Sequence, residues 1–205
     1  MSSRFEQIYS KNEWGYGSGE GSLPEHNSGY VQFLEDFLGR HAIKSVVEMG
    51  CGDWQFSKDI RWGASIYHGF DVVPAVVEFN RRTYARAQVV FSLYSGDPAE
   101  LPVADLLIVK DVLQHLKDAT VQRALVQFPR FRYVLVTNCV NPRGPTVHRD
   151  IEDGDFRYLD LRLPPFALRA AEVYSFHPRG NLKERLLNRP RWRKKVLLIE
   201  SAASY

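Results

Sequence analysis

The segment EMGCGD at residues 48–53 places two glycines between two acidic side chains, directly after an apolar run. Glycines such as Gly50 and Gly52 let the backbone turn tightly and approach a ligand closely. The acidic residue Asp71 ends a second apolar run, 19 residues after Gly52. A carboxylate at that distance can accept hydrogen bonds from both hydroxyls of a ribose. The spacing therefore indicates a nucleoside site, although a lone G-x-G could also be a plain turn between a strand and a helix.

Polar residues follow the next two apolar runs as well. Asp97 lies in a Ser-Gly-Asp-Pro turn, where its carboxylate could bind an adenine amino group or only bond locally. Val72 could pack on the adenine or simply belong to the core. Lys110 and Asp111 end the fourth run, and Asp111 could instead cap the following turn. These residues extend the predicted ligand site along several strand ends.

Short apolar runs alternate with helical patterns, which predicts a doubly wound α/β fold with a parallel sheet covered on both faces. Ligands of such sheets bind at the carboxyl ends of the strands. The C-terminal third breaks the alternation and predicts an antiparallel hairpin. The predicted strands are 45–49, 66–70, 88–92, 105–109, 133–137, 173–176 and 196–199, and the predicted helices are 31–38, 74–84 and 117–128.

The segments EMGCGDW, GFDVVP, SGDPAELP and ADLLIVKDVLQHL together resemble the class I S-adenosylmethionine-dependent methyltransferases. The resemblance covers about residues 40–140 and implies a Rossmann-like, seven-stranded, mostly parallel sheet with S-adenosyl-L-methionine as cofactor. Trp54 stands where the family usually has a third glycine. The cofactor-binding residues implied are Glu48, Gly50, Cys51, Gly52, Asp71, Val72, Asp97 and Lys110, with Ser18 and Gly19 from the N-terminal segment.

Two further segments, WGYGSGEGS at 14–22 and HRDIEDGDFRYLDLRLPPF at 148–166, resemble a small bacterial subgroup associated with polysaccharide and glycan biosynthesis. The resemblance implies O-methylation of a sugar hydroxyl of a glycan or glycoside. Two alternatives remain open: methylation of a protein or RNA that docks through a basic hairpin, and a non-catalytic module that only binds the cofactor. One domain is expected, with an N-terminal lid and helix (1–40), a cofactor-binding core (41–140), an acceptor-site loop (141–170) and a C-terminal hairpin (171–205).

A hydroxyl acceptor benefits from a general base, and histidine is the commonest one. His115 follows the fourth strand, and His148 lies in the expected acceptor loop, where Asp150 could orient its imidazole. Asp111 is the fourth catalytic candidate. Arg149 and Arg157 are candidates for binding the acceptor, although Arg157 could merely pair with nearby aspartates. No set of residues is specific enough to predict a metal.

The chain of 205 residues carries 27 Lys and Arg against 24 Asp and Glu, a formal charge of +3. The charge is uneven, since the stretch 179–195 holds eight basic residues against Glu184 alone. It could be a solvated hairpin, or could meet an anionic membrane surface, a phosphorylated substrate or a nucleic acid, the last being the least favoured. Two cysteines, no signal-like segment and no long apolar run lead us to expect a cytoplasmic protein.

Overall fold

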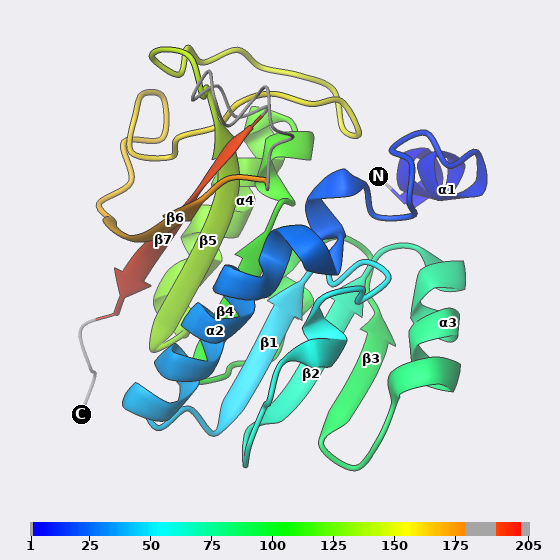
Figure 1. Ribbon diagram of the computed structural model, residues 1–205. Helices are drawn as coiled ribbons and strands as arrows, with labels where there is room; N and C mark the ends of the chain where they lie inside the picture. Colours follow the sequence, from blue (N-terminus) through cyan, green and yellow to red (C-terminus); the bar gives the residue numbers. More distant parts are fainter. Residues whose placement is uncertain (1, 179–191, 202–205) are drawn as a thin grey trace.

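The computed structural model describes residues 2–178 and 192–201 and has one seven-stranded sheet. The strand order is β3-β2-β1-β4-β5-β7-β6 (Figure 1). Strands β1 to β5 are parallel to one another, and β7 pairs antiparallel with both β5 and β6. The predicted fold class is therefore confirmed. The strands are β1 Ser45–Met49, β2 Ile66–Asp71, β3 Val89–Leu93, β4 Leu106–Lys110, β5 Tyr133–Val140, β6 Ala171–Phe176 and β7 Arg193–Glu200.

Helices cover both faces of this sheet. Side chains of α2 join one buried cluster, and side chains of α1 and α4 join the other. Both α2 and α3 begin at a proline, which suits the first turn because the missing N–H would have no helical partner there. The α-helices are α1 Ser2–Ser10, α2 Pro24–Arg40, α3 Pro74–Tyr84 and α4 Asp118–Gln127; the short 3-10 turns are Glu20–Ser22, Ser57–Asp59, Pro98–Glu100, Leu113–His115 and Phe128–Arg130.

Four predicted elements prove longer than their apolar patterns by two or more residues, namely α2, β5, β6 and β7. Helix α2 starts at Pro24 rather than at residue 31. The prediction missed this start because the first turn is polar and shows little apolar periodicity. Strand β7 starts at Arg193 rather than at residue 196, since it pairs with β5 as far as Val140. Lys194 and Lys195 therefore belong to the sheet, while residues 179–191 of the basic stretch lie outside the described residues.

Residues 141–170, the expected acceptor-site loop, contain no helix or strand but are tied to the body by backbone hydrogen bonds. The N–H of Gly154 donates to the carbonyl oxygen of His115 at 2.8 Å, and the N–H of Leu159 donates to Cys139 at 2.8 Å. The loop therefore lies over the turn after β4 and the end of β5. In the described part of the chain, no helix is long and apolar enough to cross a membrane.

Candidate active site

A cavity opens at the carboxyl ends of β1, β2 and β4. The chain turns from β1 to β2 on one side and crosses to β4 on the other, so the strand order reverses here. Ligands of open α/β sheets bind at such a switch point. The space between atoms in this cavity, its open mouth included, is about 850 Å³. We call it the first cavity.

Two glycines form the floor of the first cavity. Gly50 has φ 71° and Gly52 has φ 54°, which L side chains rarely adopt. A Cβ atom on Gly50 would lie 2.5 Å from Val112, and one on Gly52 would lie 2.4 Å from the Ser18 hydroxyl. The loop therefore needs glycine at both positions, because the backbone is left-handed there and a side chain would collide with its neighbours.

Trp54, at the position of the missing third glycine, also has a positive φ of 57°. Its side chain is 1% exposed and stacks on Trp62 with ring centroids 6.5 Å apart. The loop thus keeps the left-handed backbone that a glycine would adopt. Burial of the large indole in an aromatic cluster offsets the cost of that conformation.

Asp71 lies at the end of β2 with 6% of its surface exposed. Its carboxylate accepts hydrogen bonds from the N–H of Gly52 at 2.9 Å and of Val73 at 3.0 Å. Burial raises its pKa to about 6, although these backbone N–H groups act in the opposite direction. A carboxylate has about four lone-pair positions, so acceptor capacity remains on the side that lines the first cavity.

Three other predicted cofactor residues also line the first cavity. Glu48 is buried and accepts a hydrogen bond from the Tyr67 hydroxyl, and burial raises its pKa to about 7. Cys51 and Val72 are buried, and Val72 also belongs to the core. Asp97 differs, because its exposed carboxylate accepts from the N–H of Ala99 at 3.0 Å and does not line this cavity.

The N-terminal segment 14–22 reaches over the glycine loop. The hydroxyl of Ser18 accepts a hydrogen bond from the N–H of Asp53 at 3.0 Å and lies 2.7 Å from the hydroxyl of Tyr9. The N–H of Ser18 in turn donates to the carboxylate of Asp53 at 3.2 Å. Ser18 therefore lies in the wall of the first cavity, whereas Gly19 lines a neighbouring one.

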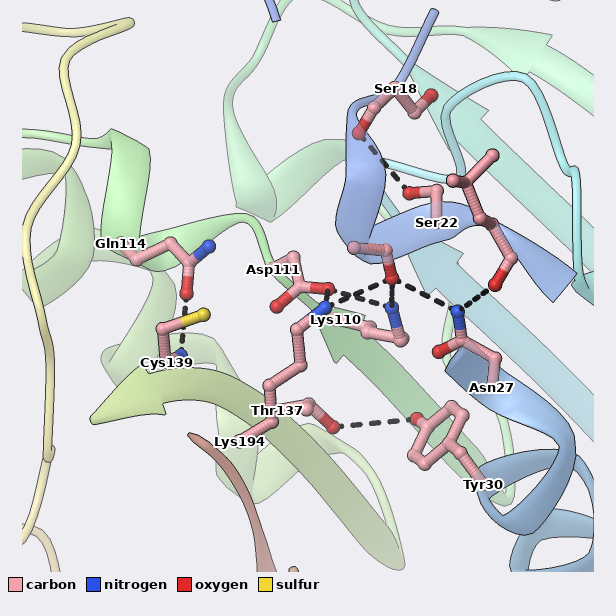
Figure 2. Close-up of polar contacts among 12 residues, drawn as sticks. Ser18, Ser22, Asn27, Tyr30, Lys110, Asp111, Gln114, Thr137, Cys139 and Lys194 are labelled. Carbon is pink, nitrogen blue, oxygen red and sulfur yellow. Dashed lines mark hydrogen bonds and ion pairs between the residues drawn. The ribbon is translucent and has the colours of Figure 1, made fainter. Parts of the chain in front are cut away.

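Three charged side chains meet where β4 ends, as Figure 2 shows. The ammonium group of Lys110 lies 2.7 Å from Oδ2 of Asp111, and the ammonium group of Lys194 pairs with the same oxygen. Both lysines also donate to the carbonyl oxygen of Gly21, at 3.3 and 3.0 Å. Lys194 comes from β7 and was missed by sequence reasoning, which counted it in a surface stretch.

Burial and mutual charge together set the pKa values in this group, which we call the lysine–aspartate cluster (Lys110, Asp111, Lys194). Burial lowers the pKa of Lys110 to about 8, although Asp111 opposes the shift. Burial also acts to raise the pKa of Asp111, but the charges of Lys110 and Lys194 outweigh it and hold that pKa below its usual value. Asp111 is therefore a fixed carboxylate and a poor base.

A second cavity adjoins the first and shares Trp14, Ser18, Asp111 and His115 with it. Nδ1 of His115 lies 2.8 Å from the carbonyl oxygen of Asp155, and its ring packs against Trp14 at a tilt of 36°, with ring centroids 4.7 Å apart. Because a carbonyl oxygen only accepts, Nδ1 carries the proton and Nε2 keeps its lone pair. Burial lowers the pKa of His115, so the imidazole is neutral at pH 7.

The structure places His148 and Asp150 outside both cavities. Nε2 of His148 lies 2.8 Å from the carboxylate of Asp118 rather than pairing with Asp150. Asp150 instead accepts hydrogen bonds at 2.8 Å from the N–H groups of Asp118 and Ile151. These contacts hold the loop 141–170 against the start of α4.

The two predicted acceptor-binding arginines make contacts that hold the same loop in place. The side chain of Arg157 is 1% exposed, pairs with Asp118 and donates to the carbonyl oxygen of Leu116 at 2.7 Å. A guanidinium buried this deeply needs such partners, which leave it little freedom to bind an acceptor. Arg149 donates to the carbonyl oxygen of Phe156 at 3.0 Å and lies beside a shallow depression away from the two cavities. Among the described residues, no group of three or more His, Cys, Asp or Glu could hold a metal ion.

Comparisons with known proteins find likeness in structure but not in sequence. No protein-family model and no curated protein matches the sequence. The structure is similar to N-methyltransferase NodS from Bradyrhizobium japonicum WM9, solved with S-adenosyl-L-homocysteine, with a TM-score of 0.66 at 14% identity over 98% of this chain and 100% of that one. It is also similar to magnesium protoporphyrin IX methyltransferase ChlM from Synechocystis PCC 6803, with a TM-score of 0.64 at 14% identity and the same coverage.

A third similar structure is the methyltransferase domain of bacterial CtHen1, with a TM-score of 0.59 at 15% identity over 86% of this chain and 99% of that one. At these identities the comparisons define the fold. The chain thus has the Rossmann-like fold of the class I S-adenosylmethionine-dependent methyltransferases.

Proposed function

We propose that the protein is a methyltransferase that uses S-adenosyl-L-methionine. The observation that carries the proposal is the first cavity, where the glycine floor, Asp71 and the segment around Ser18 meet at the switch point of the sheet. Structures with the same fold contain S-adenosyl-L-homocysteine, the product of this cofactor.

The residues of the first cavity fit this cofactor. Gly50 and Gly52 line the first cavity, where a backbone without side chains lets the methionine part of the cofactor approach closely. The carboxylate of Asp71 retains lone pairs for the ribose hydroxyls, and Val72 offers an apolar surface for the adenine. When bound, the cofactor supplies an electrophilic methyl group on a sulfonium.

Isothermal titration with S-adenosyl-L-methionine and S-adenosyl-L-homocysteine tests this proposal directly. We expect both to bind the wild-type protein, and Asp71→Ala to weaken binding about tenfold or more, because a hydrogen bond to a charged group contributes about 1.5–3 kcal/mol. Asp97→Ala is the matched control, since Asp97 lies outside the cavity. Failure of both ligands to bind at millimolar concentration would contradict the proposal.

We further propose that the acceptor is a hydroxyl, with a sugar hydroxyl of a glycan or glycoside as the leading candidate. His115 supports this, because its neutral imidazole has an unprotonated Nε2 and lines both cavities. In the reaction, Nε2 takes the proton of the hydroxyl as the oxygen becomes methylated. Trp14 and the carbonyl oxygen of Asp155 hold the ring in the orientation that this transfer needs.

Transfer of tritium-labelled methyl groups from the cofactor into fractionated host extract tests the base and the acceptor class together. We expect His115→Gln to lower the rate about 10²–10⁴-fold with little change in cofactor affinity. His148→Gln is the control, since His148 lies outside both cavities. Equal losses in the two variants would contradict the assignment of the base.

The fraction that carries the label decides among acceptors. Label in the glycan fraction would support the leading candidate. Label in protein or RNA, with a rate that falls steeply as salt rises, would support docking through the basic stretch 179–195 instead. Cofactor binding without labelling of any fraction would indicate a non-catalytic module.

A further inference from the structure

The second cavity contains two hydrogen-bond acceptors at its junction with the first. Oδ1 of Asp111 is buried and has no hydrogen-bond partner among the residues that the structure describes. Figure 2 shows this oxygen on the side of Asp111 toward Gln114, opposite the oxygen that contacts the two ammonium groups. Gln114 lines the second cavity and not the first, which places Oδ1 toward the second cavity.

The second acceptor is Nε2 of His115. It lies 3.3 Å from the side-chain nitrogen of Gln114, a long contact that a hydroxyl of a ligand can replace. Oδ1 of Asp111 and Nε2 of His115 therefore both lie beside Gln114. A ligand that satisfies both atoms needs two hydrogen-bond donors, and two hydroxyl groups close together on one ring meet that need.

The buried lysines offer no free N–H group to an anionic ligand. Each ammonium group has three N–H bonds, and two of them are accounted for by Oδ2 of Asp111 and the carbonyl oxygen of Gly21. The third side faces an aromatic ring, at 4.5 Å from Phe56 for Lys110 and 4.6 Å from Trp192 for Lys194. Lys194 and Asp111 both line the second cavity and pair with each other, so this wall presents an ion pair rather than a free charge to a ligand.

Aromatic side chains form the walls of the second cavity. Trp14, Phe156, Tyr158 and Trp192 line it. Large flat side chains of this kind pack against the apolar faces of rings. The walls therefore suit a ring, and the two acceptors suit its hydroxyl groups.

We propose that the second cavity binds an uncharged ring with two adjacent hydroxyl groups. One hydroxyl donates to Nε2 of His115, where it is methylated, and its neighbour donates to Oδ1 of Asp111. Asp111 thereby determines which ring position faces the cofactor. The inference rests on the proposed function, since it names the substrate class of the same site. A sugar ring and a catechol share this chemistry.

Saturation-transfer NMR on the wild-type protein with saturating S-adenosyl-L-homocysteine tests the proposal. The probes are catechol and the methyl pyranosides of glucose, mannose and galactose, each paired with a counterpart in which one hydroxyl of the pair is methylated or absent. We expect at least one diol to bind and to bind better than its counterpart. Binding of catechol alone would assign an aromatic diol, and binding of a pyranoside alone would assign a carbohydrate.

Asp111→Asn gives a second, independent measurement. Lysines only donate, so the amide oxygen of the new side chain turns to them and its NH₂ group replaces Oδ1 in the cavity. We expect about a tenfold loss of diol affinity in this variant, measured with S-adenosyl-L-homocysteine at saturation because Asp111 also lines the first cavity. If the variant does not fold, the preference of the wild-type protein for diols over their counterparts decides.

Two results would overturn the inference: a cofactor-bound wild-type protein that takes up no diol probe, or an Asp111→Asn protein that binds diols as well as the wild type. In both results S-adenosyl-L-homocysteine still binds, so the proposed methyltransferase function stands. Absence of S-adenosyl-L-homocysteine binding would instead contradict the proposed function itself.

Discussion

Asp71 combines deep burial with the ribose contact that we propose for it. The proposed contact needs an ionised carboxylate, yet burial raises the pKa of Asp71 to about 6. Its folded-state pKa is above the unfolded value of about 4, so its contribution to stability is present at low pH and is lost as the pH rises through about 6. The ionised carboxylate of Asp71 in the first cavity thus makes the folded state less stable near neutral pH than at low pH.

This shift predicts how cofactor affinity depends on pH. We expect the affinity for S-adenosyl-L-homocysteine to be constant above the pKa of Asp71 and to fall as the pH drops through about 6, because the carboxylate becomes protonated. Asp71→Asn should bind more weakly and lose this dependence. Isothermal titration from about pH 5 to about pH 8 measures both, and an unchanged pH profile in the variant would contradict the assignment.

Single residues also show what sequence reasoning could reach. The place of Gly50, Gly52 and Asp71 beside the first cavity was predictable, because it depends on the backbone at the end of their own strand. The surroundings of His148 were not, since they depend on Asp118, which is 30 residues away. Asp97 makes the local hydrogen bond that its turn predicts and does not line the first cavity.

At the scale of elements, β7 brings Lys194 to the site, a side chain that the sequence did not lead us to expect there. Four of the five parallel strands were predicted to within one residue at each end, whereas β5 runs three residues beyond its predicted end. Burial on both faces leaves continuous apolar runs in β4 and β5. The start of β7 was missed because Arg193, Lys194 and Lys195 read as part of a basic surface stretch. The register with β5 sets Lys194 opposite Cys139 and turns its side chain inward, where it is 2% exposed. Only the pairing of strands far apart in the chain determines this orientation.

Lys194→Met should therefore destabilise the protein, although its neighbour on β7 can be replaced at little cost. Breaking a buried ion pair costs about 3–5 kcal/mol, and the retained Lys110 places the expected loss at the lower end. Lys195→Met is the control, because Lys195 pairs with Glu172 at 2.9 Å near the surface, and such pairs contribute about 0–1 kcal/mol. Urea unfolding measures both free energies of unfolding. Equal losses would show that the lysine–aspartate cluster contributes no more to the free energy of unfolding than a surface ion pair does.

At the scale of the whole molecule, the site joins parts that lie far apart in the chain. Trp14 and Ser18 come from the N-terminal segment, Asp71 and Asp111 from the ends of parallel strands, and Lys194 from the C-terminal pair of strands. A ligand that contacts several of these parts binds only the folded state. It therefore stabilises them together, by about 2.7 kcal/mol when its concentration is a hundred times its dissociation constant.

This coupling predicts that cofactor binding slows hydrogen exchange in the segment 14–22 as well as in the glycine loop. Ser18→Ala should weaken the effect, because it removes the acceptor for the N–H of Asp53 and the partner of the Tyr9 hydroxyl, and an unsatisfied buried group costs about 1–3 kcal/mol. Ser10→Ala is the control, since its exposed hydroxyl bonds only within α1. Hydrogen exchange read by mass spectrometry, with and without S-adenosyl-L-homocysteine, compares the three proteins. Ligand protection confined to the glycine loop would show that the N-terminal segment does not close over the site, because a segment that contacts the ligand must exchange more slowly when the ligand is bound.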